Sequence, residues 1–315
     1  KKTKAGIYFD KKLKVYRTKQ PFLSETSKLF EILNMFIFSF QAFFFVVNST
    51  NFKTVMMSTC PPVIGSFLIA IACKIKGYDF YYHVCDVQPE VGLIFKDYKF
   101  QIIFNILKII DKITCFLSKK IIVMSNDMKN SLLLRGNLKK DKFHIIQNIS
   151  LPIFKTKKQK VSVKGINESK IGKDLSVIFT GNIGRFQSLE NLIHAFNSYE
   201  LSRIKLTLLG EGKELKNLKK IKLKYKNIFF KGWKSPQKTQ EYLLNSDIAV
   251  VSLKKDVIKY AYPSKTITYI NNGIPIVSIL EEKSELAKMI KKEKIGFNIP
   301  KNDIKTIKKS FIKWS

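Results

Sequence analysis

Apolar residues along this chain alternate between a two-residue spacing and a helical spacing, which predicts strands and helices in turn. In the first half the predicted elements are a strand over 52–62, a helix over 63–77 that ends at Gly77, a strand over 78–86, a helix over 100–120, a strand and a helix over 121–136 with Ser125 or Asn126 as N-cap, and a strand over 143–148. Such alternation is typical of βαβ units around a parallel sheet.

The alternation stops and then restarts, which predicts two domains. Residues 151–173 lose the periodicity and carry seven lysines. Beyond them the predicted strands are 175–181, 204–212, 227–233, 248–253 and 274–280, and the predicted helices are 188–199, 213–225, 235–247, 264–273 and a last one. We therefore expect an N-terminal domain over 1–160, a basic linker over 161–173 and a doubly wound domain over 174–315, whose ligand lies at the carboxyl ends of its strands.

The formal net charge of +33 is far from that of an ordinary globular protein. It attracts polyanions, so an anionic membrane or a nucleic acid fits, while a compositional bias toward lysine would give the same charge without any ligand. Only four of the 57 basic residues are arginine: Arg17, Arg135, Arg185 and Arg203. Because proteins that read bases favour arginine, we expect no nucleic-acid partner.

Residues 29–47 raise the question of a membrane. They are strongly apolar, but Glu31, Asn34, Ser39 and Gln41 interrupt them. Since a spanning helix is usually cleaner over about 20 residues, the pattern favours a buried or membrane-docking helix over a true span.

The metal-ligating residue types are scattered. The four cysteines lack CxxC spacing and lie in apolar or strand-like contexts, which is typical of reduced core residues in a cytosolic protein (Cys60, Cys73, Cys85 and Cys115). We interpret His83, His144 and His194 as packing residues, and we expect no metal site.

Two loops in the second half contain candidates for anion binding. After the strand over 175–181, Gly181 and Gly184 allow a tight turn whose amides could hold an anion, and Arg185 could bind a phosphate; an ordinary loop with a surface arginine has the same pattern. In "YPSK", Ser264 can cap a helix and Lys265 lies in its first turn, where the helix dipole disfavours a cation. That position favours a bound anion, or else a tolerated, solvated lysine.

In the first half, Asp86 and Glu90 follow the strand over 78–86. A pair of carboxylates could orient sugar hydroxyls or act as a base. The alternative is an N-cap aspartate and a surface glutamate.

Together these stretches resemble the family 4 glycosyltransferases of bacterial surface polysaccharide assembly, most closely the branch that transfers N-acetylated amino sugars or fucosamine. Seven stretches carry the resemblance in order over about residues 55–300: "STCPPVIGSFLIAIACKIKGYDFYYHVCDVQPE", "VMSNDMKNSLLLRG", "HIIQN", "FTGNIGRFQSLENLIHAF", "LLGEGKELKNL", "IFFKGW" and "YPSKTITYINNGIPIV".

The resemblance implies an α/β protein with the GT-B fold, in which two Rossmann-like, doubly wound domains face each other across a cleft. It places the acceptor in the first domain and the nucleotide-sugar in the second. It also implies a retaining transfer without a metal, in which cations and amides stabilise the departing diphosphate. The implied catalytic residues are Asp86, Glu90, Arg185 and Lys265. The implied donor-binding residues are Gly181, Asn182, Gly184, Arg185, Gln187, Gly210, Glu211, Gly232, Trp233, Tyr262, Pro263, Ser264, Lys265 and Thr266.

The sequence departs from the family pattern at several places. Asn182 and Gln187 stand where the family commonly has Arg and Lys, so we expect Arg185 to supply the cation. Tyr260 and Thr268 stand where it has paired glutamates, which shifts the expected donor contacts to Lys265. The usual first strand with its glycine loop and the long C-terminal helix are not found, so we expect a chain truncated at both ends.

The expected activity is transfer of a sugar, in the first place from a UDP-N-acetyl amino sugar, to a lipid-linked or polysaccharide acceptor in O-antigen or capsule synthesis. The expected location is cytoplasmic, with the protein bound peripherally to the anionic inner face of the cytoplasmic membrane. The alternatives are a non-catalytic GT-B scaffold in polysaccharide assembly and, less favoured, a basic nucleic-acid-binding protein.

Overall fold

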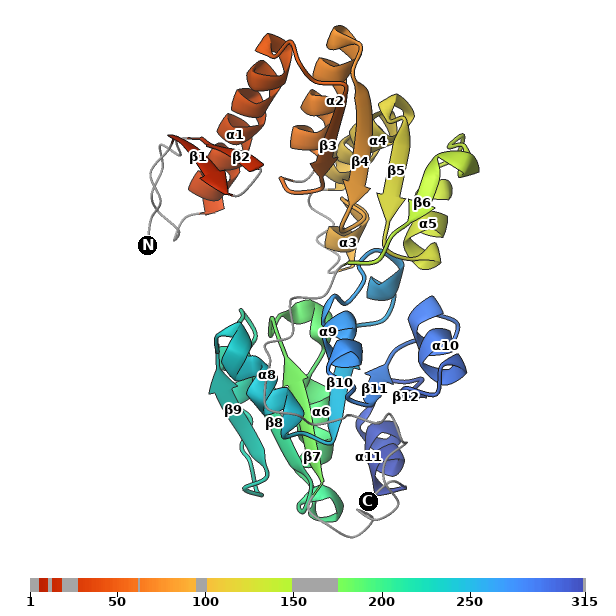
Figure 1. Cartoon of the computed structure of the whole chain (residues 1–315). Coiled ribbons are helices and arrows are strands. Elements are labelled where there is room, and N and C mark those ends of the chain that lie inside the picture. Colours follow the sequence, from red (N-terminus) through yellow and green to blue (C-terminus); the bar gives the residue numbers. More distant parts are fainter. Residues whose placement is uncertain are drawn as a thin grey trace. The chain divides into compact units, whose positions relative to one another are not determined.

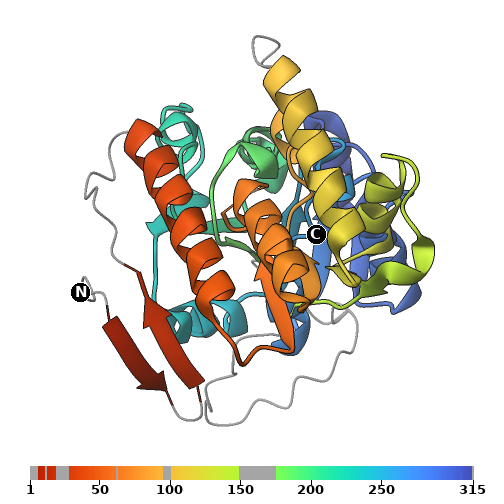
Figure 2. The ribbon, with the colours of Figure 1, turned by 90° about the horizontal axis from the view of Figure 1, so that it is seen from above.

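The chain divides into two compact units, Lys1–Ile146 and Gln147–Ser315, and each is described by itself. The computed structural model describes residues 6–10, 13–18, 28–61, 63–94, 101–148 and 175–313. The predicted linker over 161–173, and the predicted domain boundary at residue 160, lie outside the described residues. Figure 1 shows the ribbon of each unit, and Figure 2 shows it turned by 90°.

The first unit is built on a parallel sheet. Its helices and strands are, in chain order, β1 (Gly6–Asp10), β2 (Leu13–Arg17), α1 (Lys28–Asn48), β3 (Thr54–Ser58), α2 (Ile64–Lys76), β4 (Asp79–Val84), α3 (Glu90–Leu93), α4 (Gln101–Leu117), β5 (Lys120–Val123), α5 (Asn126–Leu133) and β6 (Phe143–Ile145). Strands β3, β4, β5 and β6 pair in parallel in that order. The strands and helices predicted over 52–148 are confirmed.

An antiparallel hairpin of β1 and β2 precedes α1 and was not predicted. Both faces of β2 are largely exposed, because only the central residue of the strand is half-buried. Without a single buried face, the hairpin lacks the clear apolar–polar alternation that identifies a strand in a sequence.

Local signals in the sequence determine where two helices of the first unit begin or end. Gly77 ends α2 in the left-handed conformation with φ 70°, which favours glycine. Ser125 begins α5, and its hydroxyl accepts a hydrogen bond from the Met128 amide at 3.2 Å. Ser125 is therefore the N-cap.

Helix α1 contains the apolar segment predicted over 29–47. Residues Leu29–Asn48 are long and apolar enough to cross a membrane by length and composition alone, and only 11% of the tested segment is buried in the protein. The helix packs along α2, and Figures 1 and 2 show the two side by side. The expectation of a buried helix is therefore wrong, while surface docking and a true span remain predictions.

The expectation of core cysteines is correct for two of the four. Cys73 and Cys115 are buried, Cys85 is half-buried and Cys60 is exposed; all four are free thiols. Burial raises the pKa of Cys73 to about 11, so this thiol stays protonated near neutral pH. Cys60 is not a core residue, because it lies in the turn after β3 rather than inside a strand or helix.

A buried cluster of charges holds the loop that follows β4. Arg135 donates to both carboxylate oxygens of Glu90, at 2.9 and 2.6 Å, and to the Gln88 carbonyl at 2.6 Å. The same guanidinium donates to Asp111 on α4, which also accepts from the hydroxyl of Tyr82 on β4. Burial raises the pKa of Asp111, although Arg135 acts in the opposite direction. One arginine thus joins the end of α5 to α4 and to the loop after β4.

The second unit contains a larger sheet. Its helices and strands are, in chain order, β7 (Ser176–Thr180), α6 (Glu190–Phe196), β8 (Lys205–Leu209), α7 (Leu215–Lys219), β9 (Ile228–Gly232), α8 (Pro236–Leu244), β10 (Ile248–Ser252), α9 (Lys265–Asn271), β11 (Ile276–Ile279), α10 (Glu285–Lys292), β12 (Gly296–Ile299) and α11 (Ile304–Ile312). Its five predicted strands are confirmed, whereas β12 and α11 add a strand and a helix that the sequence did not indicate.

The helix predicted over 213–225 is shorter than expected. It ends at Lys219, and residues 222–225 are irregular and bent rather than helical. Asn197 holds this segment, because its amide donates to the Lys222 carbonyl at 3.0 Å and its side-chain oxygen accepts from the Lys224 amide at 2.7 Å. A side chain distant in sequence therefore overrides the local helical spacing.

The strand order of the second sheet reverses at its centre. The order is β12–β11–β10–β7–β8–β9, and every pairing is parallel. Because crossovers between parallel strands are right-handed, strands added in opposite directions from β7 place their helices on opposite faces. This is the Rossmann order, with its switch point between β7 and β10, where ligands bind in such sheets.

The core of the second unit lies between the sheet and its helices. Val177, Phe179, Leu206 and Leu208 on β7 and β8 are fully buried. Helices α6 and α11 pack together, and the rings of Phe196 and Phe311 meet edge to face with centroids 4.8 Å apart. The predicted doubly wound domain is therefore confirmed.

We expect Arg135→Met to destabilise the folded chain by about 3–5 kcal/mol, because it removes the buried cation that pairs with Glu90 and Asp111 and leaves Glu90 only Lys108, at 3.9 Å. Urea unfolding, followed by circular dichroism, measures the change. Arg203→Met is the matched control, since Arg203 is exposed. Equal effects of the two variants would show that the buried cluster does not stabilise the fold.

Candidate functional site

The loops at the carboxyl ends of β7 and β8 form one hydrogen-bonded layer. The Gly181 amide donates to the Leu209 carbonyl at 2.9 Å, and the Ile183 amide donates to the Glu211 carbonyl at 2.8 Å. The Glu214 amide closes the layer by donating to the Ile183 carbonyl at 3.1 Å. The backbone alone therefore sets the spacing of the two loops.

This spacing requires glycine at two positions. Gly210 has φ +148°, and a Cβ there would lie 1.9 Å from the Gly181 carbonyl oxygen. Gly181 has φ +107°, and a Cβ there would lie 3.5 Å from Cε of Lys265. Because both residues are glycine, the backbones of the loops after β7 and β8 can lie close together, and Lys265 can lie against Gly181.

Arg185 begins a short 3₁₀ helix, Arg185–Gln187, that precedes α6. The helix predicted over 188–199 follows as α6, so the short 3₁₀ helix lies between the glycine loop and that helix. The Gln187 side-chain oxygen accepts from the Gly184 amide at 3.0 Å and closes the turn. Gln187 thus has a local structural role in the loop where the sequence predicts donor contacts.

The guanidinium of Arg185 lies at the surface and pairs with a carboxylate from the β8 loop. Its Nε lies 3.2 Å from Oε1 of Glu214, and 70% of the Arg185 side chain is exposed. Asn217 also donates to Glu214 at 2.9 Å, and the two partners, Asn217 first, lower the pKa of Glu214. The arginine can therefore reach a ligand at the loop edge, in competition with Glu214.

Helix α9, which follows β10, is attached to the end of β7. The Thr180 amide donates to the Tyr269 hydroxyl at 2.9 Å, and the Thr180 hydroxyl lies 3.1 Å from the same oxygen. Lys265 and Tyr269 are four residues apart and share one face of the helix. The contact made by Tyr269 thus places Lys265 beside the loop after β7, at the switch point of the sheet.

Lys265 has no ion-pair partner within the part of the chain that the structure describes. Its Nζ lies 3.8 Å from the centroid of the Phe179 ring. Burial lowers its pKa to about 7, and within the described residues no carboxylate forms an ion pair with it. A desolvated ammonium next to exposed loop backbone is a site where a bound anion would be strongly stabilised.

The remaining predicted donor residues lie around this edge. Gly232 ends β9 with φ +65°, and its carbonyl accepts from the Gly210 amide at 3.0 Å, where the pairing of β8 and β9 shifts register. Trp233 follows and is 66% exposed. In the loops after β7 and β8, Asn182 and Glu211 are exposed.

The "YPSK" turn is more buried than its sequence suggests. Tyr262, Pro263 and Thr266 are buried, and burial raises the pKa of Tyr262 to about 12. Ser264 is exposed and makes no capping hydrogen bond with its side chain. The expectation that Ser264 caps the helix through its hydroxyl is therefore wrong, because its backbone already has helical dihedral angles.

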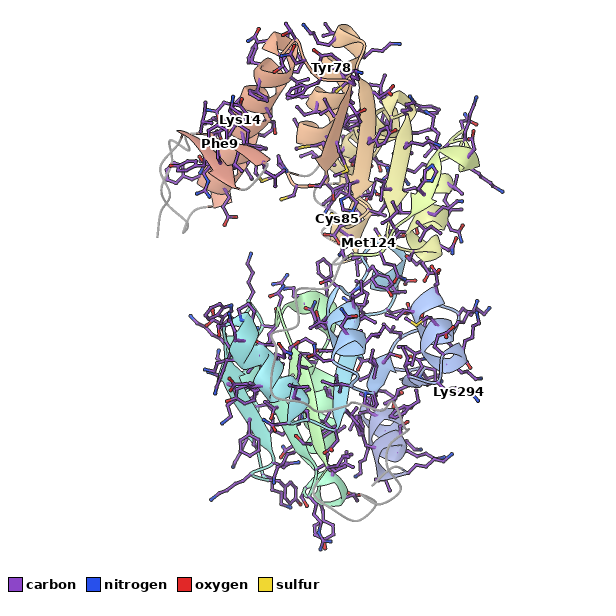
Figure 3. The ribbon with its side chains drawn as sticks, in the orientation of Figure 1. Phe9, Lys14, Tyr78, Cys85, Met124 and Lys294 are labelled. Carbon is purple, nitrogen blue, oxygen red and sulfur yellow. The ribbon has the colours of Figure 1, made fainter. Side chains whose placement is uncertain are left out.

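Asp86 and Glu90 belong to the first unit, and only Glu90 is paired. The amides of Cys85 and Asp86 donate to the Thr59 hydroxyl at 3.1 and 3.3 Å, which fixes Asp86 at the carboxyl end of β4, and burial raises its pKa. In Figure 3, Cys85 after β4 and Met124 after β5 mark this edge of the sheet. Glu90 is buried in the ion pair with Arg135 rather than at the surface. The catalytic roles of both residues remain predictions.

Within the described residues, no group of three or more His, Cys, Asp or Glu side chains is arranged to hold a metal ion.

The comparisons with known proteins agree with this geometry. Residues 164–315 match the family model described as "Glycosyl transferases group 1". Over 274 residues the chain is 24% identical to "Probable glycosyltransferase WbjE" of Pseudomonas aeruginosa, covering 84% of this chain and 67% of that protein.

Two solved structures share the fold at 12% identity. Sucrose-phosphate synthase from Thermosynechococcus elongatus aligns with a TM-score of 0.72 over 98% of this chain and 75% of its own. HepE from Anabaena, solved in complex with UDP, aligns with a TM-score of 0.60 over 88% of this chain and 71% of its own. The fold is GT-B. The predicted fold class is confirmed, and the cleft between the two domains remains a prediction.

Three residues of this site were not predicted from the sequence as site residues. The sequence placed Phe179 only within the strand predicted over 175–181, Glu214 only within the helix predicted over 213–225, and Tyr269 only within the helix predicted over 264–273. The spacing of four residues between Lys265 and Tyr269 is the one signal that could have indicated Tyr269. The contacts of Phe179 and Glu214 depend on pairing between strands and loops, which no local pattern reveals.

We expect Lys265→Met to stabilise the free protein most at and below pH 7, and progressively less as the pH rises toward about 10. The pKa of Lys265 is about 7 in the folded chain, whereas an unfolded lysine titrates near about 10.4. Between these values the unfolded chain binds the additional proton, so the wild type gains stability relative to the variant as the pH rises.

Urea unfolding of both proteins across this pH range measures the difference. Lys291→Met is the control, because Lys291 is exposed and its replacement removes one surface charge without removing a desolvated one. A wild-type-minus-variant difference that does not change with pH would contradict the placement of Lys265 in a desolvated site.

Proposed function

We propose that this chain is a group 1 glycosyltransferase that transfers a sugar from a nucleotide-sugar to a lipid-linked or polysaccharide acceptor, with retention of configuration. The observation that carries the proposal is the uncompensated ammonium of Lys265 against Gly181, at the switch point of a Rossmann sheet. The match of residues 164–315 to the glycosyl transferases group 1 model supports it.

The proposed diphosphate position follows from the chemistry of this edge. When a sugar leaves its nucleotide, negative charge develops on the diphosphate. Lys265 and Arg185, together with the backbone amides near Gly181 and Gly184, supply fixed positive charge there. We expect the diphosphate to displace Glu214 from Arg185, because a bidentate arginine–phosphate contact is stronger than a single exposed pairing.

The proposed nucleoside position lies toward β9. Gly232 connects to Gly210 through a backbone hydrogen bond, so the exposed Trp233 stands at the same carboxyl edge as the diphosphate loops. An exposed indole can stack on a base. UDP is the favoured nucleotide because HepE, which has the same fold, was solved with UDP.

The acceptor and the mechanism are proposed at the level of chemical class. The first unit presents Asp86 at the carboxyl end of its sheet, where a carboxylate can orient acceptor hydroxyls. We propose a lipid-linked acceptor for envelope polysaccharide synthesis, an N-acetyl amino sugar as the transferred group, no metal, and a location at the cytoplasmic face of an anionic membrane. The net charge of +33 supports that location.

A second candidate is a GT-B scaffold that binds nucleotide without turnover. Tyr260 and Thr268 favour it, because neither carries a carboxylate to hold the hydroxyls of a donor sugar. It predicts UDP binding without donor hydrolysis or transfer.

We expect Lys265→Ala and Arg185→Ala each to weaken UDP binding by about 10- to 100-fold, which corresponds to the loss of one charge-assisted interaction. Isothermal titration calorimetry with UDP measures the change. Lys291→Ala, which removes a surface charge on α10, should bind as the wild type does. If both site variants bind UDP as tightly as the wild type, the site assignment is wrong.

We expect Trp233→Ala to weaken UDP binding by about tenfold and to leave the binding of inorganic diphosphate unchanged, because stacking acts on the base alone. Competition titrations with both ligands separate the two contributions. Equal losses for UDP and diphosphate would place Trp233 away from the base.

A further inference from the structure

Helix α4 has its apolar stripe on the outside. Ile102, Ile106, Ile109, Ile113 and Phe116 are between 41% and 77% exposed. Their spacing of four, three, four and three residues places them on one side of the helix.

The opposite side of α4 is buried and contains a charged residue. Asp111, Thr114 and Cys115 are buried there, and Asp111 is held by the buried cluster around Arg135. Since the buried side is fixed by ion pairs, the helix cannot rotate to hide its isoleucines. The exposed stripe is therefore a stable property of the fold.

Helix α1 carries a similar stripe. Leu29, Leu33, Phe36, Phe40 and Phe44 follow one helical side and are between 37% and 63% exposed. Helix α2 packs against both α1 and α4, and Figure 2 shows the three helices side by side. Two apolar stripes thus belong to one layer of helices.

The hairpin of β1 and β2 extends this layer. Tyr16 packs on Phe45 of α1 with ring centroids 4.8 Å apart. Phe9 is 75% exposed, and Figure 3 shows it with Lys14 on the hairpin. Aromatic and basic side chains are interleaved there, as Lys14 Nζ lies 5.0 Å from the Tyr16 ring. We call the α1 stripe, the α4 stripe and this hairpin the apolar surface.

Contiguous exposed apolar side chains on neighbouring helices are typical of interaction surfaces. Its charge selects the partner. Lys112 lies on α4, and Lys74 and Lys76 lie at the end of α2, whereas the one acidic residue of α4 is the buried Asp111. The other lysine of α4, Lys108, pairs with Glu90, with 3.9 Å between Nζ and Oε1. Two copies that each carry +33 repel one another, whereas anionic headgroups attract this surface.

We propose that the apolar surface docks on an anionic lipid bilayer, with α1 and α4 lying in the boundary between headgroups and acyl chains. An apolar helical side with lysines beside it is the pattern of helices that lie in this boundary. This inference rests on the proposed function in one respect: the proposed lipid-linked acceptor is itself located in a membrane.

Helix α1 lies on the bilayer in this arrangement and does not cross it. Its carboxyl end is attached to the first unit, because the Tyr78 hydroxyl donates to the Ser49 carbonyl at 2.6 Å. Phe45 also packs on Phe52, with ring centroids 6.0 Å apart. Crossing the membrane would separate α1 from α2 and expose the buried Ser39 and Val46.

The test is sedimentation of the full chain with vesicles of phosphatidylglycerol and phosphatidylcholine. We expect the wild type to bind these vesicles more tightly than vesicles of phosphatidylcholine alone. The triple variant Ile106→Gln, Ile109→Gln and Ile113→Gln should lose at least about tenfold in partition coefficient, because it removes the centre of the α4 stripe. These side chains are exposed, so the fold should be retained.

The matched control replaces three exposed apolar residues elsewhere: Leu134→Gln, Ile304→Gln and Ile312→Gln. It should bind vesicles as the wild type does. Three outcomes would overturn the proposal: a wild type that stays in the supernatant, a triple variant that binds like the wild type, or a stripe-dependent dimer in solution with no stripe-dependent vesicle binding.

Titration with UDP separates this inference from the proposed function. The triple variant should bind UDP like the wild type, because α4 lies in the first unit and the nucleotide loops lie in the second. Vesicle binding by a chain that fails to bind UDP would keep the docking surface and reject the proposed enzyme. UDP binding without vesicle binding would reject the docking surface and leave the proposed enzyme in place.

Discussion

The close approach of two backbones, Gly210 against the carbonyl of Gly181, is the constraint on which the proposed nucleotide site depends. A side chain at Gly210 would overlap that carbonyl, so the loops after β7 and β8 could no longer exchange their hydrogen bonds. The position of Lys265 depends on the same layer, because Tyr269 attaches α9 to the end of β7 just before Gly181. The absence of a side chain at Gly210 therefore allows Lys265 to lie beside the backbone of the loop after β7.

The two units treat buried charge in opposite ways. In the first unit, Arg135 is surrounded by the carboxylates of Glu90 and Asp111, so its charge is compensated within the fold. In the second unit, Lys265 is desolvated beside Phe179, and burial lowers its pKa to about 7. A buried charge with partners fixes the loop that carries them. A desolvated charge without a partner lowers the stability of the free protein, and a bound anion would offset that loss. The contrast distinguishes a structural cluster around the buried Arg135 from a proposed binding group at the half-buried Lys265.

Helix α4 shows how the first unit combines these constraints. Its inner side places Asp111 in the cluster that holds the loop after β4, beside the buried Thr114 and Cys115, and its outer side carries exposed apolar residues. This differs from the usual surface helix, whose exposed side is polar. The ion pairs that fix the loop carrying Glu90 also fix the orientation of the exposed stripe, so the proposed docking surface and the loop after β4 depend on the same arginine.

The sequence by itself determined the alternation of strands and helices, the ends of α2 and α5 at Gly77 and Ser125, and the stretches that match a GT-B protein, because these depend on local spacing and on residues with special backbone preferences. It also indicated Gly181, Arg185 and Lys265, since glycine, arginine and a lysine in a first helical turn stand out in any context. Only the tertiary structure decided that Glu90 is buried against Arg135, that Tyr269 holds α9, and that α1 is exposed. Those outcomes depend on contacts between residues 45 to 89 positions apart, or on how a helix packs, and no local pattern of apolar residues contains that information.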